Sequence, residues 1–275
     1  MDHKKTNSHR PEPGKVRVEN KQTVYTVGQE EKDVVLLTAA ELALYPRASF
    51  RNDTDLVSVQ LPEGLTELPD SFFFGCSSLT RVRLPYTLRR IGDHAFYGCT
   101  SLKELVLPDV LEDIGQFAFA GCSALTEQHI PRSVMRIGTA AFRDCVSLRR
   151  VEFRQDAKLR ELGSHCFQNC SSLPFCFLPA GVKALPTSLF YGCGSLKRFE
   201  VPATVAVVQE NAFYKSHLKE VVFHSAETQL HPHALDGLED AACSLWEGGH
   251  CLAITKREIT ETLCVGDLAE DTAEC

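Results

Sequence analysis

The chain has 275 residues and a net charge of −7, and 44% of its residues are hydrophobic and 24% charged. These are the proportions of an ordinary folded protein, long enough for one large domain or two small ones. They exclude a basic nucleic-acid-binding face, and no apolar run approaches the roughly 20 residues of a membrane-spanning helix.

The N-terminal segment is polar. Residues 1–15, "MDHKKTNSHRPEPGK", have no apolar core of a secretory signal, and we expect them to be disordered. We therefore expect a cytoplasmic protein, with the cell surface or secretion as the alternative. Residues 16–56 are predicted to form an N-terminal cap: a hairpin in Lys15–Val27 that turns near Asn20, then a degenerate repeat from Val34 to Leu56.

An internal repeat occupies residues 57–223. Each unit reads L-x-x-V-x-L-P, a variable loop, and L-x-x-I-G-x-x-A-F-x-x-C-x-x-L, and we count about eight units. Successive cysteines of the motif are separated by 23, 23, 23, 25 and 23 residues. These cysteines are Cys76, Cys99, Cys122, Cys145, Cys170 and Cys193, and phenylalanines keep the same step at Phe50, Phe73, Phe96, Phe119, Phe142, Phe167, Phe190 and Phe213.

The pattern of one unit predicts one coil of a solenoid. The alternation V-x-L indicates a short strand with one buried face, and the proline that follows ends the strand because it lacks an N–H donor. The I-G-x-x-A-F segment then turns and buries Ile91, Ala95 and Phe96 from the opposite side. A single coil cannot bury its own apolar edges, so neighbouring coils must stack.

The repeated cysteine is predicted to be structural. A catalytic nucleophile occurs once, whereas a residue that recurs with the repeat has the same packing role in every coil. The Cys99 and His94 of "HAFYGCTSL" could be read as a nucleophile and base, but we expect His94 on the surface of the turn. Disulfides between stacked coils stay an alternative, since coils lie only about 4.8 Å apart.

These units resemble the leucine-rich repeats of the BspA, or Treponema pallidum, type. The resemblance rests on L-x-x-V-x-L-P, I-G-x-x-A-F and G-C-x-S-L, recurring from roughly Val34 to Phe223. It implies a right-handed α/β leucine-rich-repeat solenoid of about eight 23-residue coils, with short parallel strands on the concave face and turns or short helices on the convex face. It also implies protein or surface binding rather than catalysis.

Two irregularities interrupt the repeat before it ends. The fifth unit has two extra residues in "FRQDAKLREL", between Phe153 and Leu162, which should bulge from one edge, and the unit at Phe213 replaces the cysteine by Ser216. Residues 224–275 are predicted to be a C-terminal cap with an acidic tail, because they hold 11 acidic and 2 basic residues. Within them, "HCLAITKREITETLCVG" predicts a strand, a turn and a helix.

The candidate partner-binding residues lie beside the central buried position of each strand and face outward. Most pairs mix charges, but "PFCF" places Phe175 and Phe177 outward, and exposed aromatics with a charged rim are typical of binding hot spots. Alternatively, a covering segment or a one-residue register shift buries the pair and exposes Cys176. The candidates are Arg81, Arg83, Glu127, His129, Arg150, Glu152, Phe175, Phe177, Arg198 and Glu200.

The sequence favours a non-catalytic scaffold, because it contains no P-loop, G-x-G-x-x-G or G-x-S-x-G motif. We expect a monomer that binds a protein partner, with no cofactor, metal, nucleic acid or membrane insertion. The alternative is a bacterial surface or secreted adhesion module for host or extracellular ligands. Weaker metal hypotheses concern His165, Cys166 and Cys170, and a tail set whose members are His231, His233, Cys243, His250, Cys251 and Cys264.

Overall fold

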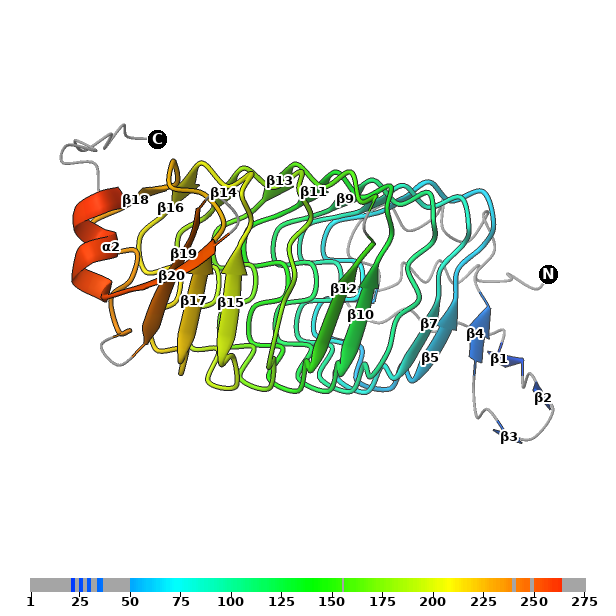
Figure 1. Cartoon of the computed structure of the whole chain (residues 1–275). Helices are drawn as coiled ribbons and strands as arrows, with labels where there is room; N and C mark the ends of the chain where they lie inside the picture. Colours follow the sequence, from blue (N-terminus) through cyan, green and yellow to red (C-terminus); the bar gives the residue numbers. More distant parts are fainter. Residues whose placement is uncertain are drawn as a thin grey trace, which may run out of the picture.

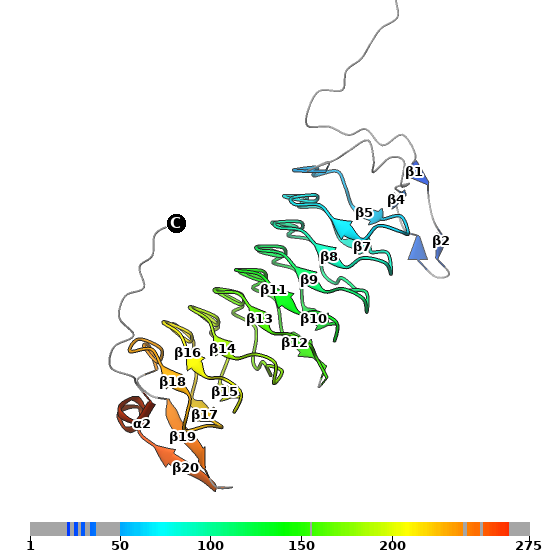
Figure 2. The ribbon, with the colours of Figure 1, turned by 90° about the horizontal axis from the view of Figure 1, so that it is seen from above.

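The computed structural model is a stack of coils that run from one end of the molecule to the other (Figure 1). It describes residues 50–154, 156–238, 241–247 and 250–263, together with the strand segments 21–22, 25–26, 29–30 and 34–36. Seen from above, successive coils lie as roughly parallel layers, with the helix at the C-terminal end (Figure 2). The predicted leucine-rich-repeat solenoid is confirmed. The expected disordered segment, residues 1–15, and the acidic end after residue 263 lie outside the described residues.

One side of the stack carries the longer strands, and we call it the long-strand face (Figure 1). Its neighbouring strands are parallel, and equivalent residues of successive coils stand side by side, as Val59 and Val82 do. Two coils, at residues 103–107 and 174–178, contribute no strand, so the ladder is interrupted there. The strands are β5 (Ser58–Gln60), β7 (Arg81–Arg83), β10 (Glu127–Ile130), β12 (Arg150–Phe153), β15 (Arg198–Val201), β17 (Glu220–Phe223) and β19 (Ala242–Glu247).

The opposite side carries a second row of short parallel strands, where turns or short helices were expected. Between residues 50 and 238 the described residues form no helix. A Cβ at Gly92 would lie 2.7 Å from the Leu68 carbonyl oxygen, so the glycine of I-G lets the backbones of neighbouring coils approach closely after this strand. The strands are β6 (Glu67–Leu68), β8 (Arg90–Ile91), β9 (Asp113–Ile114), β11 (Arg136–Ile137), β13 (Glu161–Leu162), β14 (Ala184–Leu185), β16 (Val207–Val208) and β18 (Gln229–Leu230).

In seven of the turns that follow a short strand, a residue other than glycine adopts the left-handed conformation. His94 has a φ of 57° and Phe117 a φ of 53°, a conformation that costs an L-residue roughly 1–2 kcal/mol. His94 is half-buried and its ring stacks on Phe117 with centroids 5.0 Å apart, and Ala140 at the same position is fully buried. His94 thus lies at the surface of the turn as expected, and the ring of the next coil covers part of it.

Two ladders of side chains fill the interior. The phenylalanine rings stack from coil to coil, with centroids 5.3 Å apart between Phe96 and Phe119 and 5.2 Å between Phe119 and Phe142. Beside them, each motif thiol donates a hydrogen bond to the carbonyl oxygen of the ladder phenylalanine in the preceding coil, as Cys122 does to Phe96 at 3.2 Å. The thiol thus combines an apolar side chain with a donor that alanine would lack.

Ser216 marks the one position where the described ladder replaces this thiol by a hydroxyl. Its side chain is buried, and its Oγ has no hydrogen-bond partner. At this position the ladder pattern makes the Phe190 carbonyl oxygen the acceptor, and the longer Cβ–S bond of cysteine would bring a donor closer to it. We therefore expect Ser216→Cys to raise the free energy of unfolding by about 1 kcal/mol. Urea unfolding followed by circular dichroism measures this, and a variant less stable than wild type would contradict it.

Charged side chains on the short strands alternate in sign along the stack. Arg90 lies between Glu67, at 2.6 Å, and Asp113, at 3.2 Å, and Arg136 contacts the same Asp113 carboxylate at 2.7 Å. The hydrogen bond to Asp113 is the largest cause of a raised pKa of Arg136, and the negative charges of Asp113 and Glu161 raise this pKa as well. Adjacent opposite charges stabilise neighbouring strands, so this row adds to the apolar packing.

The N-terminal end carries an antiparallel hairpin of short strands. β1 (Lys21–Gln22) pairs antiparallel with β4 (Val34–Leu36), and β2 (Tyr25–Thr26) with β3 (Gln29–Glu30). The predicted turn near Asn20 lies outside the described residues. β4 pairs in parallel with β5, so this hairpin covers the first edge of the long-strand sheet.

The C-terminal end continues the coil geometry past Phe223, where we expected the repeats to stop. β18 pairs in parallel with β16, and β19 with β17. Leu235 and Leu238 take the phenylalanine and cysteine positions and are buried, which hid this unit from the motif. The predicted strand, turn and helix then follow as β20 (His250–Ile254), antiparallel to β19, and α2 (Lys256–Leu263).

Candidate functional site

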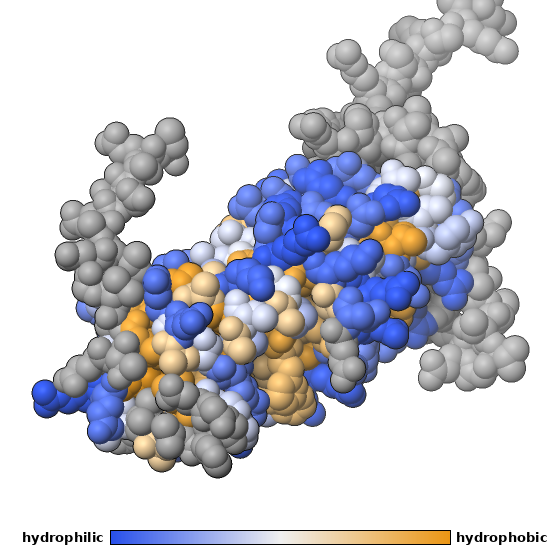
Figure 3. Space-filling model, turned by 45° about the horizontal axis from the view of Figure 1, so that its top comes forward, coloured by the Kyte–Doolittle hydropathy of each residue, from blue (hydrophilic) through white to orange (hydrophobic). Residues whose placement is uncertain are grey.

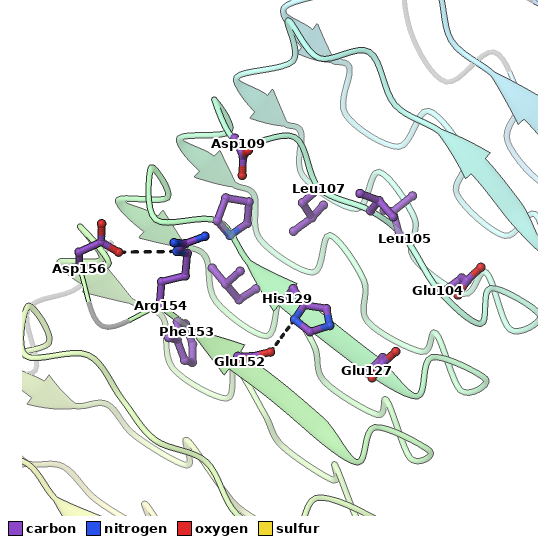
Figure 4. Close-up of a pocket in the computed structure, with 13 residues that line it drawn as sticks. Glu104, Leu105, Leu107, Asp109, Glu127, His129, Glu152, Phe153, Arg154 and Asp156 are labelled. Atoms are coloured by element: carbon purple, nitrogen blue, oxygen red, sulfur yellow. Dashed lines mark ion pairs between the residues drawn. The ribbon is translucent and has the colours of Figure 1, made fainter.

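A hollow of about 760 Å³ opens on the long-strand face at the first interruption of its ladder (Figure 4). Carboxylates stand around it, and the view shows Glu104 and Glu127 toward one end and Asp109, Arg154 and Asp156 toward the other. Apolar side chains line the space between them. The lining residues are Glu104, Leu105, Val106, Leu107, Asp109, Glu127, His129, Ile130, Pro131, Glu152, Phe153, Arg154 and Asp156.

Ion pairs hold one side of the hollow. Glu152 Oε2 lies 2.7 Å from His129 Nδ1 and 3.2 Å from Arg150 Nη2, and Asp156 contacts Arg132 at 3.3 Å and Arg154 at 3.7 Å. Asp156 and Arg154 belong to the fifth unit's insertion. The two extra residues therefore bulge at the edge of the hollow and extend its wall.

A buried glutamine lies beneath the hollow at a position that is apolar in the other coils. Gln128 is 2% exposed, and its Nε2 donates to the carbonyl oxygens of Leu105, at 3.2 Å, and His129, at 3.1 Å. The Leu105 oxygen is the acceptor that an unbroken ladder would give to a backbone N–H of the neighbouring strand. The side-chain amide thus bridges the gap between residues 103–107 and β10 and keeps the two coils together.

The second interruption presents the predicted aromatic pair. Phe175 is 44% and Phe177 66% exposed, their ring centroids are 5.8 Å apart, and Cys176 between them is buried. The register is therefore the one in which both rings face outward, and no described segment folds over them. Hydrophilic residues cover much of the side seen in Figure 3, and its apolar areas are smaller patches between them.

The other predicted residues are divided between these two places and the rest of the face. The structure brings Glu127, His129 and Glu152 into the hollow, with Arg150 bound to Glu152. Toward the C-terminal end, Arg198 contacts Glu200 at 3.1 Å and Glu220 at 3.3 Å. Arg83 lies 3.5 Å from Gln60 in the neighbouring coil, and Arg81 is exposed beside it on β7.

The motif cysteines lie in the interior, away from both places. Nine cysteines whose side chains the structure describes are free thiols, and all nine are buried. Burial raises the pKa of Cys76 and of Cys193 to about 12, and it raises the pKa of Cys99 further. A thiol that stays protonated at neutral pH is a poor nucleophile and a poor metal ligand.

No group of three potential metal ligands gathers among the residues whose placement the structure describes. His165, Cys166 and Cys170 do not form one, and burial raises the pKa of both thiols, which disfavours the thiolate that a metal would bind. In the tail set, the ring centroids of His231 and His233 are 5.8 Å apart and His233 contacts Asp236 at 2.9 Å. Cys264 and the side chains of His250 and Cys251 lie outside the description.

The pattern of the BspA type leucine rich repeat region matches residues 45–158 and 112–240 of the chain, in six copies. The chain belongs to the BspA-type leucine-rich-repeat family. The resemblance seen in the repeat motifs is thereby confirmed. No curated protein matches the chain.

Solved structures with a similar fold share little sequence with this chain. A leucine rich cell surface protein from Faecalibacterium prausnitzii is 23% identical over 80% of this chain and 72% of its own, with a TM-score of 0.49. The leucine rich repeat protein of T. pallidum is 28% identical over 70% of this chain and 67% of its own, with a TM-score of 0.42. No helix in the described part of the chain is long and apolar enough to cross a membrane. The cytoplasmic location and its surface alternative stay predictions.

Sequence reasoning missed the hollow while naming three of its residues. Glu104 and Val106 have the alternation of an outward-facing pair, but nothing in their pattern shows that their coil lacks a strand, and Val106 is 82% exposed. Two signals point to the place: Gln128 at an otherwise apolar position, and the insertion one coil later. Both mark departures from the repeat, where a repeat protein tends to place its specific features.

Proposed function

We propose that this protein is a non-catalytic binding module that presents the long-strand face to a protein partner. The observation that carries the proposal is the Phe175–Phe177 pair, two exposed rings fixed side by side in an otherwise charged strip. Large exposed aromatics rimmed by charge supply most of the binding energy at many protein interfaces.

The solenoid supports this role because it holds the face rigid. Cys176 anchors the segment between the rings in the core, and the coils on both sides provide charged neighbours in Arg150, Glu152, Arg198 and Glu200. A surface that is ordered before binding loses little conformational entropy when the partner arrives.

A crosslinked pull-down from an extract of the source cells tests the proposal. We expect wild type to capture a protein that the double variant Phe175→Ser, Phe177→Ser loses by about tenfold or more, since hot-spot truncation costs roughly 2 kcal/mol or more. Tyr86→Ser is the matched control, because Tyr86 is 70% exposed but lies on the turn after β7.

Capture that is unchanged in the double variant would contradict the role of the aromatic pair. Equal losses in the double variant and in Tyr86→Ser would indicate non-specific apolar adsorption. A parallel capture from extracellular material tests the alternative of a surface module. A ligand that is found only in this material, and that the double variant does not bind, would indicate an extracellular partner for the same binding face.

A further inference from the structure

Two glutamates at one end of the hollow place like charges on neighbouring coils. On the short strands, neighbouring coils alternate in sign, as Glu67, Arg90, Asp113 and Arg136 do. On the long-strand face, Glu104 and Glu127 take equivalent positions in adjacent coils, 23 residues apart. Like charges on adjacent strands repel, so this arrangement costs stability in the free protein.

Neither glutamate is neutralised within the described part of the chain, where no ion pair reaches Glu104 or Glu127. Arg150 stands next to Glu127 in the register of β10 and β12, but its guanidinium contacts Glu152. Asp109, at the far end of the hollow, likewise has no ion pair among these residues. The hollow therefore keeps an excess of negative charge open to an incoming cation.

Between the carboxylates, the hollow is apolar. Leu105, Leu107 and Ile130 line it from the core, Phe153 forms a wall, and Val106 is 82% exposed beside Glu104. An apolar floor with carboxylates at its ends suits a side chain that has an aliphatic stem and a charged head. Lysine and arginine have this form, and they bury the stem while the head stays at a polar rim.

The size and position of the hollow indicate a segment of chain rather than one side chain. Its volume of about 760 Å³ exceeds what a single lysine or arginine fills. The coil that follows β12 carries Phe175 and Phe177, so one extended partner can lie across both places. We propose that the hollow binds a basic segment of the protein partner, with Glu104 and Glu127 accepting hydrogen bonds from its lysine or arginine. This inference rests on the proposed function and names the chemistry of the partner.

Fluorescence anisotropy with two synthetic peptides tests the inference on the full chain. One acetylated, amidated peptide alternates leucine and arginine, and the other alternates leucine and glutamate. We expect wild type to bind the arginine peptide, and the double variant Glu104→Gln, Glu127→Gln to bind it about tenfold more weakly. The control is Glu63→Gln, Glu227→Gln, which removes the same charge from exposed positions outside the hollow and should bind like wild type.

Three outcomes overturn the inference. Equal weakening in both double variants assigns the binding to the protein's net negative charge. Equal binding of the glutamate peptide excludes charge recognition, and equally tight binding of spermidine at the same concentration excludes a role for the apolar floor. In the pull-down, capture lost by Phe175→Ser, Phe177→Ser but kept by Glu104→Gln, Glu127→Gln overturns this inference alone. Capture kept by both variants overturns the proposed function as well.

Discussion

Raising the pH from 9 to 12 is expected to remove the stability that the buried thiols contribute. Burial raises the pKa of Cys193 from 9.0 to about 12, because a thiolate there would lose its hydration, and the neutral thiol donates to the Phe167 carbonyl oxygen at 3.1 Å. Between these pH values the unfolded chain releases a proton that the folded chain keeps. The contribution is complete below pH 9 and is lost as the pH rises toward the folded pKa, by about 1.4 kcal/mol per pH unit for each thiol.

A comparison with Cys193→Ala isolates this effect from the tyrosines and lysines, which titrate alike in both proteins. The stability difference between wild type and Cys193→Ala, measured by urea unfolding at pH 8, 9, 10 and 11, should shrink as the pH rises above 9. A difference that stays constant over this range would show that the thiol ionises equally in both states. Thiol-specific labelling of the native protein at pH 8 should correspondingly be slow until the protein unfolds.

Replacing Phe119 by alanine is expected to lower the free energy of unfolding by about 3–5 kcal/mol. The Phe119 ring is fully buried between Phe96 and Phe142, with centroid distances of 5.3 Å and 5.2 Å. Its removal leaves a cavity in the middle of the stack, where coils on both sides are fixed by their own hydrogen bonds and cannot collapse into it. Chemical denaturation followed by circular dichroism measures the loss.

Phe177→Ala is the matched control for that experiment, because the same side chain is 66% exposed on the long-strand face. It should change the stability by less than about 0.5 kcal/mol. A loss below about 1 kcal/mol for Phe119→Ala would contradict the assignment of the phenylalanine ladder. Since each coil contacts only its neighbours, the loss should also appear as earlier opening of the middle coils, which hydrogen exchange detects.

The regular part of the fold could be predicted because every coil repeats the same physical solution. Phe96, Cys99 and Ile91 are buried where the motif placed them, and Phe175 and Phe177 face outward in the expected register. The motif did not detect a coil in which other apolar residues fill the same buried positions. Leu235 and Leu238 fill the phenylalanine and cysteine positions without matching the pattern, and the coil geometry continues beyond Phe223.

The hollow could not be predicted because it depends on a strand that does not form. Glu104, Leu105 and Val106 have the alternation of a strand, but the structure forms none there, and the Gln128 side chain contacts the Leu105 carbonyl oxygen instead. The short strands on the other side were missed for a related reason. Two residues such as Arg90 and Ile91 are too few for a periodic signal, and their pairing comes from the coils above and below.

The alternating charges on the short strands bear on how such an array can lengthen. A duplication of the single coil that contains Arg90 would place one arginine against another, between Glu67 and Asp113. A duplication of two adjacent coils would carry an arginine and a carboxylate together and preserve the alternation. Lengthening this part of the array by pairs of coils would therefore keep its ion pairs, although the packing motif repeats with every coil.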